Sequence, residues 1–454
     1  MKTCQPASVS PERAEPRVSP LATADPASTS VPATTTFSRR RLLARLGLFT
    51  AAVTASPALA ALPTRPRCEK GGQQLMALTE YERALDALPR EADCPVLKDL
   101  HARYSSRPIH KETIPATRKG QTVDLAVFQT GKLGADRVAV LIHGCLAAHE
   151  TWWYVAGALG DDHELWILDL PGCGESEAPS TKLEPDAFTP TAMAERVGIV
   201  LERCLAARTY RGLPAPRLTL VGHSLGGACS LRLVGSPMLR ERFACVRQQL
   251  DALVLFAPCD VAINSLPSSF LPLMTLTPVM VGVGRALGVV DEKVRAITRK
   301  SYFLPECATR EQAERFMESL AVPTHLRSAQ AMVRGAVPWK LEENRPDWPA
   351  ITPLEAEYAN VDVPCLIAWG EWDETLPETM GHKIRDRVPG ARLVEITGAG
   401  HSVISEQPLA CVHIIRTGQA AVEGKRFPAL PLVCSYGTKP FDGPFTPAQA
   451  TVNG

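Results

Sequence analysis

The sequence lacks the features that would place it among nucleic-acid-binding, zinc-binding or repeat proteins. Its 49 Lys and Arg residues nearly balance its 48 Asp and Glu residues, and they form no dense basic block. This balance argues against a nucleic-acid partner. None of its 13 cysteines stands in a CxxC pair, so the spacing typical of a zinc site is absent. No internal repeat is evident, and we expect neither a metal nor another cofactor.

A long, uninterrupted apolar run is also missing. Residues 271–290 have the length of a membrane span, but they contain Pro272, Pro278, Arg285 and three glycines. We therefore expect no integral span once a signal has been removed. The composition, 45% hydrophobic and 21% charged, is that of a globular protein with a large core. A length of 454 residues fits two or three domains, or one large domain with an insertion.

The N-terminal region reads as a leader rather than as part of the fold. Residues 1–37 are rich in Pro, Ser, Thr and Ala, which predicts either disorder or an upstream extension from a misassigned start. Residues 38–60 follow, with a basic start, a modest apolar run and the small-x-small pattern Ala58-Leu59-Ala60. This segment resembles a twin-arginine export signal, which implies an exported protein that begins near Ala61. A basic-flanked anchor or a chance pattern is the alternative.

The cysteines are scattered along the chain. Five of them fall in or beside predicted strands and helix starts, where cysteine usually behaves as a small buried hydrophobe, namely Cys145, Cys173, Cys229, Cys259 and Cys365. An oxidising compartment would permit a disulfide between Cys68 and Cys94, or between Cys411 and Cys434. The spacing does not decide between these possibilities.

Short apolar runs alternate with helical stretches from about residue 113 onward. The runs at 137–144, 163–172, 217–224, 250–258, 363–370 and 391–400 are typical of parallel strands buried on both faces. Residues 122–131 alternate like a half-exposed strand. Helical stretches at 191–208 and 377–388 complete a strand–helix–strand pattern. We therefore predict an α/β fold with a mostly parallel sheet, helices on both faces, and chemistry at the carboxyl ends of the strands.

One long interval breaks this pattern. About one hundred residues between the runs at 250–258 and 363–370 show helical signals and no clear strand, which predicts an inserted helical cap. The predicted organisation is an extension (1–37), a signal (38–60), a partly helical segment (61–112), the first part of the core (113–260), the cap (261–355), the second part of the core (356–424) and a tail (425–454).

The stretch GHSLG, residues 222–226, matches the pattern G-x-S-x-G at the point where a strand should turn into a helix. A tight strand–turn–helix bend would present the Ser224 hydroxyl above the sheet edge, and only small neighbours allow that bend. Ser224 is therefore the predicted nucleophile. A glycine-rich turn whose serine merely caps the helix is the alternative.

A serine hydroxyl needs a base, and the base needs an orienting acid. His401 follows the last predicted strand and is the predicted base, and Asp373 follows the strand before it and is the predicted acid. Glu371 and Glu374 flank this aspartate, and Asp260, at another strand end, is an alternative acid. The oxyanion of such a reaction also needs donors. The backbone N–H groups of Leu225 and Cys145 are the candidates, unless His143-Gly144 is an ordinary strand-exit turn.

These motifs together resemble the α/β-hydrolase superfamily. The segments LIHGC, LDLPGCGES, LVGHSLGG, WGEWDETLP and GAGHS occur in its order across residues 120–415. The resemblance implies an α/β-hydrolase fold with Ser224 as nucleophile, Asp373 as acid and His401 as base. It also implies Cys145 and Leu225 as oxyanion donors. A serine at the elbow departs from the aspartate of haloalkane dehalogenases and epoxide hydrolases.

The predicted function is a carboxylic-ester hydrolase that forms an acyl-enzyme with a small apolar ester. A cofactor-free haloperoxidase or perhydrolase, a lactonase or amidase, and a carbon–carbon bond hydrolase could use the same triad. A binding protein without activity could keep the same fold. The DLPGCGES segment is expected to be a structural turn. For Trp152 and Trp153, the sequence favours neither a place in the acyl pocket nor one in the core.

Overall fold

The computed structural model describes residues 95–261, 277, 280, 301–303, 309–340, 343, 345–396 and 398–421. The predicted extension, signal and C-terminal tail lie outside these residues, as does the 271–290 run apart from 277 and 280. Within the described residues, no helix is both long and apolar enough to cross a membrane.

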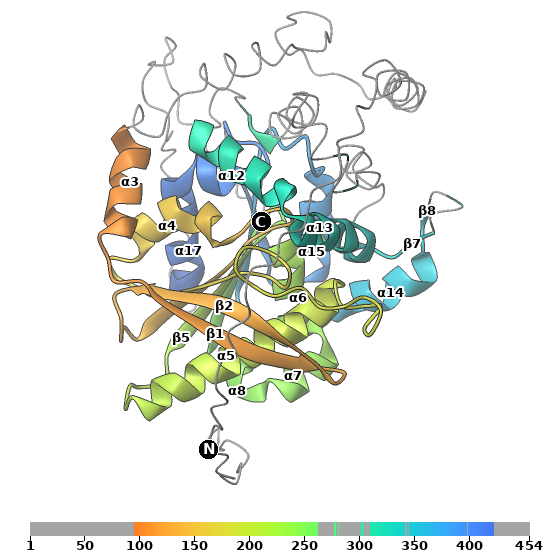
Figure 1. The fold of residues 1–454 in the computed structure, drawn as a ribbon, viewed down its shortest axis with the longest axis horizontal. Coiled ribbons are helices and arrows are strands. Elements are labelled where there is room, and N and C mark those ends of the chain that lie inside the picture. Colours follow the sequence, from red (N-terminus) through yellow and green to blue (C-terminus); the bar gives the residue numbers. More distant parts are fainter. Residues whose placement is uncertain are drawn as a thin grey trace, which may run out of the picture. The chain divides into compact units, whose positions relative to one another are not determined.

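Eight strands form one sheet in the order β1-β2-β4-β3-β5-β6-β9-β10 in the described part of the chain (Figure 1). The six strands from β4 to β10 in this order are mutually parallel, whereas β1 and β2 pair antiparallel at one edge. This confirms the predicted α/β fold with a mostly parallel sheet. The strands are β1 (His110–Arg118), β2 (Gln121–Gly131), β3 (Arg137–Ile142), β4 (Glu164–Leu168), β5 (Arg217–His223), β6 (Leu250–Phe256), β9 (Cys365–Gly370) and β10 (Arg392–Ile396).

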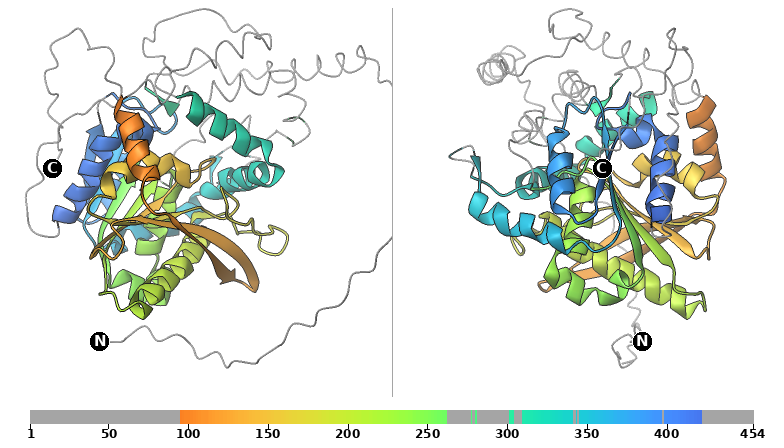
Figure 2. Two further views of the ribbon diagram at one scale, coloured as in Figure 1. Left: turned by 60° about the vertical axis from the view of Figure 1, so that its left-hand side comes forward. Right: turned by 180° about the vertical axis from the view of Figure 1, so that it is seen from behind.

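Helices cover both faces of the sheet, which is why β4 and β9 are buried along their whole length. Helices α3, α4 and α17 pack on one face, and α5, α6 and α15 pack on the other (Figures 1 and 2). The helices on the first face are α3 (Pro95–Ser105), η3 (His149–Trp152), α4 (Trp153–Leu159), α16 (Val403–Glu406) and α17 (Pro408–Ala421). The remaining core helices are α5 (Pro190–Tyr210), α6 (Leu225–Gly235), α7 (Pro237–Arg242), α8 (Ala244–Arg247), η6 (Glu357–Asn360) and α15 (Thr379–Arg387).

The antiparallel edge differs from the sequence prediction. β2 alternates only in its first half, whereas residues 125–130 are all buried. Residues 121–126 pair with β1 alone, residues 127–129 pair with both β1 and β4, and residues 130 and 131 pair with β4, so the second half of β2 lies deeper in the sheet than the first. β1 was not predicted, since its exposed residues interrupt any apolar run and only Ile114, Ala116 and Arg118 are buried.

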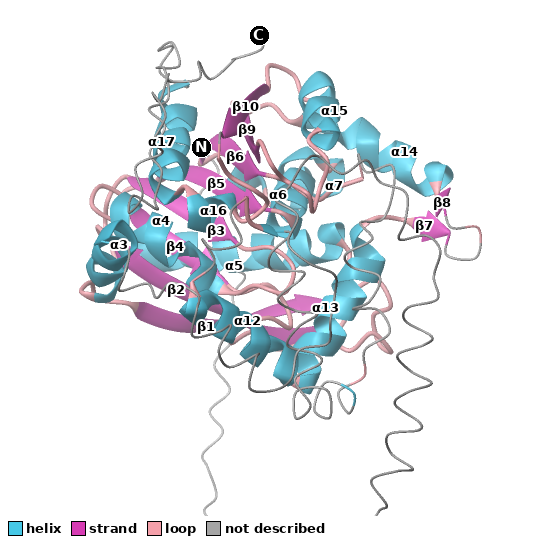
Figure 3. Cartoon of the chain, turned by 90° about the horizontal axis from the view of Figure 1, so that it is seen from above, coloured by secondary structure: helices cyan, strands magenta, loops and turns pink. Residues whose placement is uncertain are grey.

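The described part of the interval predicted as a cap contains α12 (Arg310–Ala321), α13 (Pro323–Ala336) and all but the last residue of α14 (Trp348–Ala356). It also contains a two-stranded ladder that the sequence did not suggest, β7 (Trp339–Lys340) with β8 (Arg345–Pro346). This ladder lies away from the main sheet, whereas α12 and α13 lie next to the main sheet (Figure 3). Cys145, which follows β3, contacts α13 through its thiol, 3.8 Å from the Ala329 carbonyl oxygen. The inserted helices therefore lie over the carboxyl ends of the strands.

Candidate active site

Ser224 occupies a strained turn between β5 and α6. Its φ of 52° and ψ of −119° place a residue with a side chain in a region that ordinarily requires glycine. The surrounding backbone holds it there, because the Ser224 N–H donates to the Phe256 carbonyl at 2.9 Å and its own carbonyl accepts from Cys259 at 2.9 Å. Backbone hydrogen bonds to the end of β6 and to the loop after it therefore keep Ser224 in this strained conformation.

The glycines around Ser224 are required by close backbone approach. A Cβ at Gly222 would lie 2.5 Å from the Gly226 carbonyl oxygen, and one at Gly226 would lie 2.3 Å from the Ile142 carbonyl oxygen. At Gly227 it would meet the Pro258 Cβ at 2.7 Å. These contacts bring β3, β5 and α6 together at the turn, and a side chain at any of the three positions would separate them.

His401 and Asp373 are in hydrogen-bond contact, with His401 Nδ1 2.8 Å from Asp373 Oδ2. The other carboxylate oxygen, Oδ1, accepts from the backbone N–H groups of Thr375 and Leu376, both at 2.8 Å. The Asp373 side chain is 1% exposed and the His401 side chain 9%. A carboxylate fixed by two amides presents its remaining oxygen to the imidazole, which orients the ring and favours the tautomer with the proton on Nδ1.

Ser224 and His401 line the same pocket, whereas no hydrogen bond joins the Ser224 hydroxyl to the His401 ring among the described residues. Catalytic hydrogen bonds of this kind are often long in a ligand-free protein. Cys145 also lines this pocket, and Leu225 is the first residue of α6. A Cβ at Gly144 would lie 2.9 Å from the Ser224 Cβ, so the strand exit that carries Cys145 passes directly beside Ser224.

The alternative acid Asp260 lies in a different environment. Its Oδ2 is paired with the Arg232 guanidinium and accepts from the Tyr358 hydroxyl at 2.8 Å, in a fully buried cluster. Glu371, another alternative, accepts from the Gly398 N–H at 3.2 Å through Oε2. Of these three carboxylates, only Asp373 has a hydrogen bond to His401 in the described part of the chain.

Two side chains that the sequence analysis did not single out hold the His401 loop. His223 donates from Nε2 to the His401 carbonyl oxygen at 2.8 Å, and burial lowers the pKa of His223 to about 3, so the ring is neutral. Glu406 accepts through one oxygen from Gly400 and through the other from Phe303, both at 2.7 Å. Neither contact has a sequence signal, although His223 is the variable position directly before the nucleophile.

The residues before Cys145 have a structural role. His143 is fully buried, accepts from the Leu170 N–H at 3.0 Å through Nε2 and contacts the Gly144 carbonyl at 2.7 Å through Nδ1. Burial lowers the pKa of His143, so it is neutral. The loop that carries Cys145, which we call the predicted oxyanion loop, is thus fixed to the loop after β4 by an uncharged imidazole.

The DLPGCGES turn is built around Asp169, which accepts from the backbone N–H groups of His149 at 2.7 Å and Glu175 at 2.9 Å. A Cβ at Gly174 would lie 2.2 Å from the Asp169 carboxylate, which explains that glycine. Gly174 and Glu175 also line the pocket, so the turn is not only structural.

Neither tryptophan lines the pocket, which corrects the equal assignment made from the sequence. Trp152 is fully buried and packs 6.4 Å from Phe256, between ring centroids. Trp153 stacks on His101 at 4.6 Å, and the Arg315 guanidinium lies 4.5 Å above its ring. Trp153 therefore supports a pocket residue from behind.

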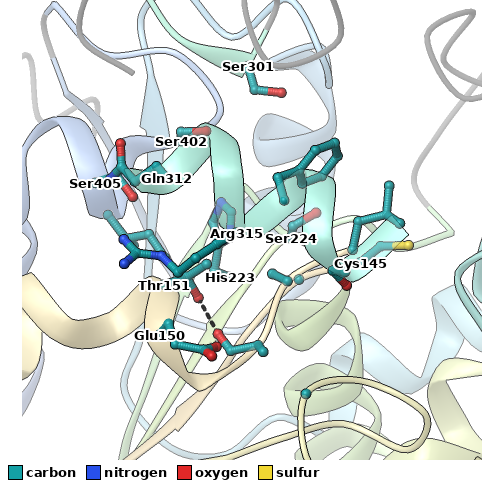
Figure 4. A pocket seen from close by; sticks show the side chains of 18 of the residues that line it. Cys145, Glu150, Thr151, His223, Ser224, Ser301, Gln312, Arg315, Ser402 and Ser405 are labelled. Atoms are coloured by element: carbon teal, nitrogen blue, oxygen red, sulfur yellow. Dashed lines mark hydrogen bonds between the residues drawn. The ribbon is translucent and has the colours of Figure 1, made fainter. Parts of the chain in front are cut away.

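The pocket has a volume of about 400 Å³ (Figure 4). One side is formed by the strand-end site, which we define as Cys145, Ser224, Asp373 and His401, although Asp373 lies behind His401 and does not itself reach the cavity. The other side is the α12 wall. It consists of residues spaced three or four apart on one helical face, namely Gln312, Arg315, Phe316 and Ser319.

The thiols near the site are largely buried. Burial raises the pKa of the Cys145 and Cys259 thiols to about 12, so both are protonated and unreactive at neutral pH. Among the described residues, no group of three His, Cys, Asp or Glu side chains is arranged to hold a metal ion.

Comparison with known proteins agrees with this geometry. The sequence profile described as the alpha/beta hydrolase family matches residues 139–414, more than half of the chain. This protein belongs to the alpha/beta hydrolase family. That membership supports a hydrolase and confirms the resemblance noted from the motifs.

The sequence relatives of this alpha/beta hydrolase include uncharacterized proteins of Mycobacterium bovis and Mycobacterium tuberculosis. Each is 24% identical over 313 residues, which cover 68% of this chain and 82% of the relative.

Solved structures show the same fold at low identity. One is 2-hydroxy-6-oxo-6-phenylhexa-2,4-dienoate hydrolase of Rhodococcus (TM-score 0.52, 17% identity, 70% of this chain and 100% of that chain). Another is a serine hydrolase of Cycloclasticus zankles (TM-score 0.50, 16% identity, 70% of this chain and 99% of that chain).

Proposed function

We propose that this alpha/beta hydrolase is a carboxylic-ester hydrolase that works through an acyl-enzyme. The observation that carries the proposal is the 2.8 Å hydrogen bond between His401 Nδ1 and Asp373 Oδ2, in a pocket that also contains the strained Ser224. A serine hydroxyl is inert at neutral pH without a base, and an imidazole is an effective base only when its tautomer is fixed. The fixed His401 ring and the presence of Ser224 in the same pocket support the proposal.

In the proposed mechanism, the Ser224 oxygen attacks the ester carbonyl carbon while its proton passes to His401 Nε2. The developing oxyanion accepts hydrogen bonds from the backbone N–H groups of Cys145 and Leu225. Collapse of the tetrahedral intermediate breaks the bond to the alkoxy oxygen, which leaves with the proton from His401. Water then repeats the sequence on the acyl-enzyme and releases the carboxylic acid, which restores the serine.

The preference we propose is for an ester with an apolar part. Leu146, Phe316, Val322 and Ile404 contribute apolar side chains to the pocket. Each methylene that such a pocket encloses gains about 0.8 kcal/mol. We expect kcat/KM to rise severalfold per carbon across short acyl chains and to level off when the pocket is full. A flat chain-length profile would contradict this preference and favour perhydrolysis of a small acid.

The test of the reaction class is labelling with a fluorophosphonate probe. We expect the wild type to be labelled, and Ser224→Ala, with an unchanged circular dichroism spectrum, to lose both the label and the hydrolysis of 4-nitrophenyl esters. A folded wild type that neither reacts with the probe nor hydrolyses any ester of a graded acyl panel would contradict the proposal and favour a binding protein.

We further propose that the protein is exported and that its mature chain begins near Ala61. The support is the basic, apolar and small-residue pattern of residues 38–60, which lie outside the described part of the chain. N-terminal sequencing of the protein recovered outside the cytoplasm is the test. Exported protein that retains residues 38–60 would overturn the proposal.

A further inference from the structure

The α12 wall places one positive charge in the pocket. Arg315 lies on the same helical face as Gln312, Phe316 and Ser319, at spacings of three and four residues, and all four line the cavity. In Figure 4, Arg315 and Gln312 lie on one side of Ser224, together with Ser402 and Ser405, and Cys145 lies on the other side. The pocket thus has a polar end that is distinct from the predicted oxyanion loop.

The Arg315 guanidinium is held by an aromatic ring and not by a carboxylate. Its Cζ lies 4.5 Å from the centre of the Trp153 ring, and Trp153 is itself stacked on His101 at 4.6 Å and on Tyr104 at 5.9 Å. Within the described residues, Arg315 forms no ion pair. A guanidinium stacked on a ring keeps its N–H donors in the plane and available, which suits bidentate binding of a carboxylate or phosphate.

The acidic residues of the pocket do not neutralise this charge by direct contact. Glu175 is ion-paired with Lys111, and Glu150 lies 3.6 Å from His149 Nδ1. Glu318, three residues along α12, is exposed. Arg315 is therefore the pocket cation that has no carboxylate bound to it in the described part of the chain.

Hydroxyl groups surround the same end of the cavity. The Tyr302 hydroxyl donates to Gln312 Oε1 at 3.2 Å, and Ser402 and Ser405 line the pocket beside them. The apolar side chains of Phe316 and Ile404 line the same pocket. An apolar chain that ends in an oxyanion matches this combination of apolar and polar surface.

We infer that the pocket binds esters in which an apolar chain ends in an anionic group, a carboxylate or a phosphate, and that Arg315 binds this group. The inference rests on the proposed function for the position of the ester carbonyl at Ser224. The anion-binding role of Arg315 does not depend on turnover, so it is tested first by binding.

The binding experiment compares hexanoate with hexanamide, which have the same shape and differ in charge. Calorimetry on the intact Ser224→Ala chain is expected to give at least about tenfold tighter binding of hexanoate, because a charge-assisted hydrogen-bond pair is lost in the amide. In a chain that also carries Arg315→Gln, the ratio should fall to near one, and with Arg315→Lys it should be intermediate. Hexyl phosphate and inorganic phosphate, measured in the same way, distinguish a preference for phosphate from one for carboxylate.

The matched control is Arg327→Gln, which removes the same charge from an exposed position on α13 that does not line the pocket. It should leave the hexanoate-to-hexanamide ratio unchanged. Thermal unfolding verifies that the Arg315 variants are folded, and Arg315→Lys serves if Arg315→Gln is not. The inference is overturned if hexanoate binds no more tightly than hexanamide when Arg315 is present, or if hexanoate keeps its tighter binding in the chain with Arg315→Gln.

Turnover then tests the substrate class. With 4-nitrophenyl hemiesters of adipic to sebacic acid, we expect kcat/KM at least about tenfold above that of the matching ω-amides, with a maximum at one chain length. Arg315→Gln should remove this advantage. If the wild type reacts with a fluorophosphonate but hydrolyses the hemiesters no better than the ω-amides, the inference about anionic substrates is contradicted and the proposed reaction is not. If the protein binds hexanoate through Arg315 but never reacts with the fluorophosphonate, the proposed reaction is contradicted and the anion-binding role of Arg315 is not.

Discussion

The two sides of the pocket are held by different kinds of interaction. The strand-end site is fixed through its backbone: Ser224 by hydrogen bonds to the strand exits, Asp373 by two amides, and the His401 loop by side chains that bind its backbone groups. The α12 wall is fixed by side chains. Its N-terminus has a capping box between Thr309 and Gln312, and Arg315 stacks on a tryptophan.

This difference suggests that the strand-end site carries out the reaction and that the α12 wall selects the substrate. Backbone contacts tolerate little displacement, which suits groups that must meet within a fraction of an ångström. Side-chain contacts can be exchanged one at a time without moving the sheet, which suits groups that choose a substrate. We therefore expect changes in the strand-end site to affect turnover strongly and changes around the α12 wall to affect it weakly.

The largest effect is expected for Asp373→Asn. The single oxygen of the asparagine would accept from the Thr375 and Leu376 amides, so its NH2 group would face His401 Nδ1 as a donor. The imidazole would then be held in the wrong tautomer, and kcat should fall by about 10⁴. Steady-state kinetics on 4-nitrophenyl acetate measure this. Asp260→Asn is the control, because it breaks a buried pair with Arg232 and should cost about 3–5 kcal/mol of unfolding free energy while activity per folded molecule persists. The reverse outcome would move the acid to Asp260.

Gly226→Ala should be the next most damaging change. The new Cβ would lie 2.3 Å from the Ile142 carbonyl oxygen and 2.4 Å from that of His143, so α6 and the predicted oxyanion loop must separate. Loss of donor alignment predicts a fall in kcat/KM of about 10²–10³. Gly390→Ala is the control: it has φ of +68° but no atom within 4 Å, so it should cost only about 1–2 kcal/mol and leave turnover unchanged. Equal losses in both variants would contradict the steric argument.

Acid should destabilise the strand-end site through its buried histidines. Burial lowers the pKa of His223 to about 3 and also lowers that of His143, so the folded chain binds fewer protons than the unfolded chain below about pH 6.5. Stability is then lost as the pH falls, at up to about 1.4 kcal/mol per pH unit for each histidine. His149 has the opposite sign: burial would lower its pKa, but Asp169 raises it, so its contribution is lost as the pH rises. Urea unfolding at pH 7, 6 and 5 measures the slope, and an increase in stability over this interval would contradict the prediction.

His223→Phe should lower kcat/KM by about tenfold. The change removes the donor to the His401 carbonyl, which leaves that buried oxygen unpaired and the catalytic loop less well positioned. It should also shift the acidic limb of the pH–rate profile and flatten the pH dependence of stability. His223→Gln, which keeps an N–H donor, should restore part of the activity. A His223→Phe enzyme with normal kcat/KM and an unshifted profile would show that the contact positions nothing.

The smallest effect is expected for Thr309→Ala at the start of α12. Loss of the capping box should destabilise this helix by about 1 kcal/mol. Hydrogen exchange should report faster opening of 310–321, whereas kcat for 4-nitrophenyl acetate should stay within about twofold. A tenfold loss of turnover on this small ester would contradict the separation between the two sides of the pocket.

Much of the strand-end site could be predicted from the sequence because its residues stand at fixed places in chain order. The glycines around Ser224 predict its turn, and His401 and Asp373 each follow an apolar run that predicts a strand. Parallel strands bring their carboxyl ends to one edge, so order along the chain predicts proximity in space. The sequence favoured Asp373 but left Asp260 as an alternative acid, because both follow a strand; the structure shows that only Asp373 has a hydrogen bond to His401 in the described part of the chain.

The α12 wall could not be predicted at the level of residues. Arg315 lies on an amphipathic helix whose charged residues look solvated in sequence, and its partner Trp153 is 162 positions away. The role of His223 could not be predicted either, because it occupies a variable position of the G-x-S-x-G motif. Its contact with the His401 carbonyl joins positions 178 residues apart.

By itself, therefore, the sequence determined the mostly parallel sheet, the tight turn at Ser224 and the placement of Ser224, Asp373 and His401 after successive strands, because these follow from local backbone preferences and from the geometry of consecutive strands. Tertiary structure alone decided which carboxylate orients His401, which histidine holds its loop and which cation enters the pocket. Those choices depend on contacts between distant segments, whose distances and burial no local pattern encodes.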